Sequence, residues 1–223
     1  MSENLTFIET LITSIINNRN MPKVQVEREI SPILDIYMPD ILKELVGKNN
    51  QRYQHILSEF PLQVVQEKGK INNSSKNIDS LFLEDDDTLI FIELKTDFTS
   101  YNKKQKKFYS DIIQNIKNNS ANFLFEFLDT LSKKSSKKTK YILARESILN
   151  KFNIEKLRAI RKAKLIYIVP KRTKNETLKE LDGIDATIDF TAIGSVRATK
   201  FKDEWSIISK KIIDLDKYEK NKK

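Results

Sequence analysis

The sequence contains no cysteine and only one histidine, His55, in 223 residues. Without thiols the chain can form no disulfide, no thiolate zinc site and no iron–sulfur cluster, and it has no cysteine nucleophile. A single imidazole also disfavours zinc sites that need two or three histidines. Any metal site must therefore use mostly oxygen ligands, which favour Mg²⁺ or Mn²⁺.

Glycine and proline are also scarce, with 4 and 5 residues respectively. Together with 39% hydrophobic and 32% charged residues, this composition excludes collagen-like and disordered chains. No apolar run approaches the roughly 18 residues of a membrane span. Residues 1–4 lack the basic region and apolar core of a signal peptide. We therefore expect a globular, cytoplasmic protein with no membrane partner.

Basic residues exceed acidic ones: 40 Lys and Arg against 31 Asp and Glu give a net charge of +9. This excess favours a polyanionic partner such as nucleic acid, although charge alone does not separate DNA from RNA or from an anionic membrane. The length suits a single domain spanning 1–223, with N-terminal helices and a flexible charged tail at 218–223. The sequence leaves the oligomeric state open.

The apolar spacing predicts an α/β fold in which helices flank a mixed β-sheet. A helical stripe covers 4–18, and one or two helices follow at 32–46, where Met38-Pro39 allows a break. Residues 24–32 suit either an extended segment or a helix start at Ser31-Pro32. We further expect a hairpin at 79–95, strands at 60–66, 141–144, 165–169 and 186–190, helices at 108–116, 123–131, 154–162, 176–181 and 203–215, and a surface loop at 68–76.

Charged side chains end the second strand of the predicted hairpin, whose turn, Glu84-Asp85-Asp86-Asp87, we expect to be solvated. This strand is apolar on both faces until Glu93 and Lys95, which are two residues apart and so project from the same face. If Asp79 lies on the adjoining strand near that edge, Asp79, Glu93 and the Leu94 carbonyl could hold a hard divalent cation, with water completing its shell.

Such a group suits hydrolysis of a phosphodiester bond. A bound divalent cation would stabilise charge on the phosphate and acidify a water molecule. Lys95 would either orient the attacking nucleophile or deprotonate it, and the sequence leaves this choice open.

The same residues carry a resemblance to a known family. Asp79, followed after 13 residues by Glu93-Leu94-Lys95, resembles the bipartite motif of the PD-(D/E)XK nuclease superfamily. Ile78 stands where that motif usually has proline. The resemblance covers about residues 25–170 and implies a restriction-endonuclease-like core with Mg²⁺ or Mn²⁺ bound by Asp79 and Glu93 and with Lys95 as the catalytic lysine.

A second motif follows the lysine. Gln105-Lys106-Lys107-Phe108-Tyr109 is similar to the Gln-x-x-x-Tyr signature of RecB-like members of the superfamily. At helical spacing Gln105 and Tyr109 share a face with Ile112 and Ile116, which predicts that both polar side chains face the site. The alternative is a structural role, in which Gln105 and Tyr109 are a buried polar pair whose hydrogen bonds are made with the backbone.

The resemblance also implies a further metal ligand from an N-terminal helix, either Glu27 or Glu29. The Glu-x-x-x-Ser spacing from Glu27 to Ser31 favours Glu27. The predicted activity is a metal-dependent nuclease that hydrolyses DNA phosphodiester bonds.

Two rival functions remain open. One is a non-catalytic nucleic-acid-binding or interaction module on the same fold; the other is a phosphate-ester or nucleotide hydrolase on an unrelated α/β fold, which the lack of a glycine-rich phosphate loop disfavours. The lysine runs at 102–107 and 133–140, and the cations Arg158, Arg161 and Lys162, suit either DNA contact or a solvated surface.

Overall fold

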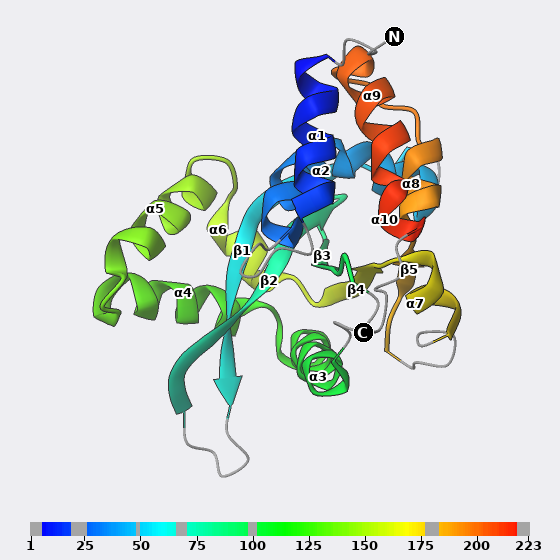
Figure 1. The fold of residues 1–223 in the computed structure, drawn as a ribbon. Coiled ribbons are helices and arrows are strands. Elements are labelled where there is room, and N and C mark those ends of the chain that lie inside the picture. The colour runs from blue at the N-terminus through cyan, green and yellow to red at the C-terminus, as the bar shows by residue number, and fades with distance from the viewer. Residues whose placement is uncertain are drawn as a thin grey trace, which may run out of the picture. The chain divides into compact units, whose positions relative to one another are not determined.

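The computed structural model describes residues 6–18, 26–47, 50–65, 71–97, 102–176 and 183–217. They form an α/β fold with helices and one five-stranded sheet in the order β1-β2-β3-β4-β5 (Figure 1). The strands β1, β2 and β3 pair antiparallel, whereas β4 and β5 pair parallel. The mixed sheet predicted from the sequence is confirmed. The strand bounds are β1 Tyr53–Val65, β2 Ile71–Glu84, β3 Thr88–Leu94, β4 Lys162–Ile168 and β5 Ala186–Ile188.

The chain divides into two compact units. The first unit contains residues 1–51, 94–102 and 166–223, and the second contains 52–93 and 103–165. The single domain over 1–223 stays a prediction, and the predicted tail at 218–223 lies outside the described residues. None of the helices that the structure describes is both long and apolar enough to cross a membrane.

The second unit is built on the hairpin of β2 and β3. All seven side chains of β3 are buried, as its apolar pattern on both faces predicts. The Phe60 and Phe125 rings meet edge to face with their centroids 5.8 Å apart, which links β1 to a helix. The helices of this unit are α3 Lys103–Asn119, α4 Asn122–Lys134, α5 Lys138–Leu149 and α6 Ile154–Ala159.

The hairpin turn depends on consecutive aspartates. Asp85 and Asp86 have φ angles of 48° and 64°, a left-handed conformation that aspartate tolerates better than most residues, and the Asp87 amide donates to the Glu84 carbonyl at 3.1 Å. Glu84 corrects the prediction of a wholly solvated turn, because it is only 3% exposed. Its carboxylate accepts from the Tyr53 hydroxyl at 2.9 Å and pairs with Lys164 Nζ at 2.6 Å.

The first unit is mainly helical. Trp205 lies in its core: the ring centroids of Trp205 and Tyr37 are 4.3 Å apart, and the indole Nε1 donates to the Val196 carbonyl at 2.8 Å. Trp205 therefore faces inward from the segment expected to be helical at 203–215, where the structure has helices at Lys202–Ile212 and Asp214–Lys217. The helices are α1 Phe7–Asn18, α2 Val26–Leu45, α7 Lys171–Glu176, α8 Phe190–Ser195, α9 Lys202–Ile212 and α10 Asp214–Lys217.

The structure decides between alternatives that the sequence leaves open in the N-terminal half. Of the one or two helices expected at 32–46 it has one, α2, which begins at Val26, contains Pro32 and Pro39 and ends at Leu45. Proline removes one amide donor, which a long and well-packed helix tolerates. The loop expected at 68–76 is wrong in part, because β2 begins at Ile71, while residues 68–70 lie outside the described residues. Its polar residues pair with β1, and this tertiary pairing outweighs their low strand propensity.

Predictions in the C-terminal half differ in type or length. The strand expected at 141–144 lies inside α5, since a short apolar run does not by itself distinguish a strand from a helix. The helix expected at 154–162 ends at Ala159. The strand expected at 186–190 ends at Ile188 because Asp189 caps α8, accepting from the Ala192 amide at 2.8 Å. Most of the helix expected at 176–181 lies outside the described residues.

The close packing of α8 against α9 gives a test of this fold. A Cβ atom on Gly194 would lie 2.5 Å from Ile213 Cγ1 and 2.9 Å from the Ser209 carbonyl oxygen. We expect Gly194→Ala to lower the free energy of unfolding by about 1–3 kcal/mol, measured by urea titration, because these atoms must move apart. Combined with Ile213→Ala it should cost less than the sum of the single changes. An unchanged free energy in Gly194→Ala would contradict this packing.

Candidate functional site

Asp79 and Glu93 lie at neighbouring positions on β2 and β3. Ser80 pairs with Ile92 in the antiparallel register, and Asp79 and Glu93 are the next residue on each strand. Since side chains alternate between the faces, both carboxylates lie on the face opposite to Ser80 and Ile92. Opposed residues of this kind have Cβ atoms about 4.5–5.5 Å apart. The geometry thus places the two carboxylates on one face of adjoining strands, as the sequence suggested.

Two side chains of α3 hold the Glu93 carboxylate. Gln105 Nε2 donates to one carboxylate oxygen at 2.7 Å, and the Tyr109 hydroxyl donates to the other at 2.7 Å. Gln105 Nε2 also lies 2.8 Å from the Tyr109 hydroxyl oxygen. The spacing of four residues places both side chains on one helix face. Gln105 and Tyr109 therefore both bond to a candidate site residue, which corrects the alternative of a pair satisfied by the backbone alone.

Burial makes these contacts necessary. Glu93 is 1% exposed, and a carboxylate removed from water needs donors in exchange. Burial raises the pKa of the Tyr109 phenol far above its ordinary value, and the charge of Glu93 and the bond to it raise that pKa further. The charge of Asp79 acts in the same direction. Tyr109 therefore stays protonated and keeps its hydrogen for the carboxylate.

Asn77 and Glu59 join this network, and the sequence did not reveal either. The Tyr109 hydroxyl lies 3.1 Å from the Asn77 carbonyl oxygen, and the Asn77 amide donates to the Glu59 carboxylate at 2.8 Å. Asn77 meets Tyr109 through its backbone carbonyl, a contact that the periodicity of side chains does not reveal. Glu59 has a φ of 54° within β1, a left-handed conformation that no sequence pattern announces.

Lys95 and Glu27 belong to the first unit. Lys95 follows the last residue of β3, is 8% exposed, and its amide donates to the Ile168 carbonyl at 2.8 Å. The Glu27 carboxylate accepts from the Thr96 amide at 3.2 Å, while Glu29 is exposed on the same helix. Of the two glutamates weighed from the sequence, Glu27 is the one bound to the segment that carries Lys95.

Asp79 and Glu93 supply oxygen ligands of the kind that Mg²⁺ prefers. Across the described ranges, from residue 6 to residue 217 with their gaps, no group of three His, Cys, Asp or Glu side chains could hold a metal ion. Mg²⁺ is commonly held by one or two carboxylates plus waters and substrate phosphates, and Asp79 and Glu93 supply two carboxylates. Gln105 and Tyr109 donate to different oxygens of the Glu93 carboxylate. The Leu94 carbonyl follows Glu93 directly in the chain.

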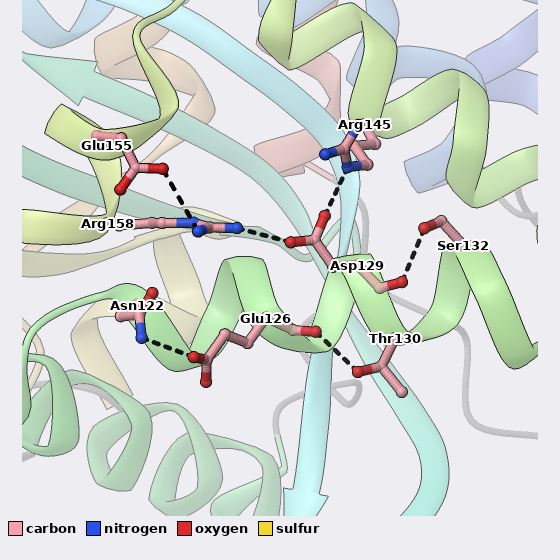
Figure 2. Close-up of polar contacts among 8 residues, drawn as sticks. All are labelled: Asn122, Glu126, Asp129, Thr130, Ser132, Arg145, Glu155 and Arg158. Carbon is pink, nitrogen blue, oxygen red and sulfur yellow. Dashed lines mark hydrogen bonds and ion pairs between the residues drawn. The ribbon is translucent and has the colours of Figure 1, made fainter.

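Three cations weighed for DNA contact have partners within the protein. Arg158 pairs with Asp129 at 2.6 Å and with Glu155 at 3.4 Å (Figure 2). Lys162 pairs with Asp87, whose carboxylate raises the pKa of the Lys162 ammonium. Arg161 donates to the Asn118 carbonyl at 3.3 Å. These intramolecular contacts give the three side chains a structural role and weaken the case for DNA contact.

No protein-family model, curated protein or solved structure matches this chain. The resemblance to the PD-(D/E)XK superfamily therefore depends on Asp79, Glu93, Lys95, Gln105 and Tyr109 alone. The geometry of these residues decides what can be proposed.

Titration of the phenols tests this site. Burial raises the pKa of both Tyr53 and Tyr109, so fewer than all seven tyrosines should ionise before alkaline unfolding, as measured by tyrosinate absorbance. Unfolded phenols ionise near pH 10, whereas these two stay protonated in the fold. The contribution of these two phenols to the free energy of unfolding is thus complete below about pH 10 and is lost as the pH rises. Above that pH, the free energy of unfolding should fall less steeply in Tyr109→Phe than in the unchanged protein, with slopes that differ by about 1.4 kcal/mol per pH unit. Ionisation of all seven phenols in the folded protein would contradict this arrangement.

Proposed function

We propose that this protein is a metal-dependent nuclease that hydrolyses DNA phosphodiester bonds. One observation carries the proposal: a buried Glu93 carboxylate held by Gln105 and Tyr109, with Asp79 at the neighbouring position of the adjoining strand. Lys95 follows Glu93 by two residues. These are the residue types, in the chain order and spacing, that the resemblance to the PD-(D/E)XK superfamily implies. Such an enzyme would act in the cytoplasm.

A purely structural role explains this group poorly. Two carboxylates at neighbouring strand positions repel each other, and burial of Glu93 adds a desolvation cost. An apolar pair of similar volume would pack there without either cost. A divalent cation offsets both the repulsion and the desolvation cost, because it neutralises the carboxylates and replaces the water that Glu93 loses on burial.

The roles divide among the residues of the chain. Asp79, Glu93 and the Leu94 carbonyl would hold Mg²⁺ or Mn²⁺, which when bound would stabilise charge on the phosphate and acidify a water molecule. Gln105 and Tyr109 fix the orientation of the Glu93 carboxylate. The Lys95 ammonium would orient the attacking water, or the neutral Lys95 amine would accept a proton from it.

A non-catalytic nucleic-acid-binding module is the second candidate. Two observations favour it: the net charge of +9, and the lack of a third carboxylate or imidazole beside Asp79 and Glu93 among the described residues. This candidate predicts salt-sensitive DNA binding with no cleavage under Mg²⁺ or Mn²⁺.

The direct test is cleavage of single- and double-stranded DNA by the purified protein with and without Mg²⁺. We expect Mg²⁺-dependent cleavage that falls by at least about a hundredfold in Asp79→Ala and in Lys95→Ala, because each removes a group that acts on the phosphate or the water. Lys202→Ala and Asp203→Ala, both on an exposed part of α9, are charge-matched controls and should cleave normally. Full activity in folded Asp79→Ala and Lys95→Ala protein would exclude the proposal.

Glu27 and Glu29 form a matched pair on one helix. Glu27→Ala should reduce cleavage at least about tenfold, because it removes the acceptor that holds the Thr96 amide next to Lys95. Glu29→Ala should leave cleavage unchanged, since Glu29 is exposed. Cleavage rates should be compared at several Mg²⁺ concentrations, because loss of a residue that supports metal binding raises the Mg²⁺ concentration required for half-maximal cleavage. Equal rates in the two variants would remove Glu27 from the site.

A further inference from the structure

The connection between α4 and α5 carries a dense positive charge. We call residues 133–140 the lysine turn: it contains Lys133, Lys134, Lys137, Lys138 and Lys140, two serines and one threonine, and no acidic residue. All five lysines are exposed. The turn joins two helices of the second unit that pack against each other (Figure 1).

The nearest acids in the sequence do not neutralise this turn. Asp129 is held by two arginines, Arg145 Nε at 2.5 Å and Arg158 Nη2 at 2.6 Å (Figure 2). Glu126 accepts instead from the Asn122 amide at 2.9 Å. No acidic residue occurs between Asp129 and Glu146.

Three other lysines of the second unit differ in this respect. Lys107, Lys162 and Lys164 each pair with a carboxylate. Within the described part of this unit, none of the five lysines of the turn forms such a pair. Their charge is therefore presented to solvent, on helices that the shared Asp129 holds together.

Helix electrostatics make this arrangement unfavourable for folding. The N-terminal end of a helix carries partial positive charge, which favours acidic residues and disfavours lysine. Yet α5 has no acidic residue in its first turn, Lys137 stands at its N-cap without a side-chain capping bond, and Lys138 and Lys140 follow. Stability of the fold does not explain these lysines, whereas an anion bound at the turn would offset their repulsion.

We propose that the lysine turn is a binding surface for the phosphate backbone of nucleic acid, additional to the Asp79 and Glu93 group. The proposal rests on the substrate class of the proposed function and extends it to a surface outside the candidate site. Separate ammonium groups along a turn can each meet one phosphate and carry no base specificity. A surface that inserts into a membrane needs large apolar side chains among its lysines, and residues 133–140 contain none.

The test measures DNA binding without cleavage. Anisotropy of a fluorescein-labelled duplex is recorded against salt concentration in EDTA, using the full chain and a variant with all five lysines changed to Gln. The control changes five exposed lysines elsewhere, namely Lys151, Lys156, Lys200, Lys202 and Lys210. Each variant loses five charges, so both carry a net charge of +4 (9 − 5).

Only the lysine-turn variant should show a weaker salt dependence. The slope of log K against log salt should fall by about 0.9 for each phosphate that the variant no longer neutralises, and by up to about 4.5 for all five lysines. Equal changes in both variants would show that binding follows net charge alone and would overturn the proposal. Binding of the wild-type chain to phosphatidylserine vesicles in place of DNA would overturn it as well.

Thermal unfolding supplies an independent outcome. Lys138→Glu with Lys140→Glu should raise the midpoint of unfolding and weaken DNA binding together, because α5 then has acids in its first turn. A lower midpoint would assign the lysines to the stability of the fold and overturn the proposal. The binding measurement does not depend on catalysis. If the chain binds DNA through the lysine turn but never cleaves it, the nuclease proposal fails and the binding surface stands. If the chain cleaves DNA equally well with and without the five lysines, the binding surface fails and the nuclease proposal stands.

Discussion

Burial of the Glu93 carboxylate is the constraint on which much of the second unit depends. A carboxylate that is 1% exposed persists only if donors replace its water, and α3 supplies them from Gln105 and Tyr109. This requirement fixes which face of α3 meets the sheet, keeps the Tyr109 phenol protonated by raising its pKa, and brings Asn77 into the same network. The Glu59 backbone then adopts a left-handed conformation where its carboxylate receives the Asn77 amide. Strained residues are retained where the surrounding contacts require them, and these contacts lead to Glu93.

Charge is arranged differently in different parts of the chain. Buried or half-buried charges have partners, as when Glu84 accepts from Tyr53 and Lys164, and Asp129 holds Arg145 and Arg158. In the first unit, the Glu27 carboxylate holds the Thr96 amide directly after Lys95. The lysine turn differs, since its five ammonium groups face solvent next to the N-terminal end of α5, whose partial positive charge disfavours cations. A protein that acts on a polyanion would use both arrangements: fixed acids for a cation, and unneutralised lysines for phosphate.

Much of the candidate site could be predicted from the sequence because it depends on local periodicity. The apolar pattern on both faces of β3 predicted that Glu93 lies on a buried strand, and the four-residue spacing placed Gln105 with Tyr109. Neither Asn77 nor Glu59 could be predicted in this way, because their roles follow from strand register and from one unusual backbone angle. The same limit applies to the fold. The apolar pattern of β3 was sufficient to predict a buried strand. Residues 141–144, in contrast, have no periodicity that distinguishes a strand from the helix α5, and the start of β2 at Ile71 depends on its pairing with β1.

Binding of Mn²⁺ to the full chain, measured by electron paramagnetic resonance and calorimetry, tests the central claim most directly, because it requires the carboxylate pair and no substrate. We predict a saturable site that is weakened at least about tenfold by Asp79→Asn and by Glu93→Gln, and to a smaller degree by Tyr109→Phe, which only frees the orientation of the Glu93 carboxylate. Asp203→Asn, on α9, should bind as the unchanged protein does. Absence of saturable binding at millimolar Mn²⁺, or equal binding in all four variants, would contradict the assignment of Asp79 and Glu93 as a metal site.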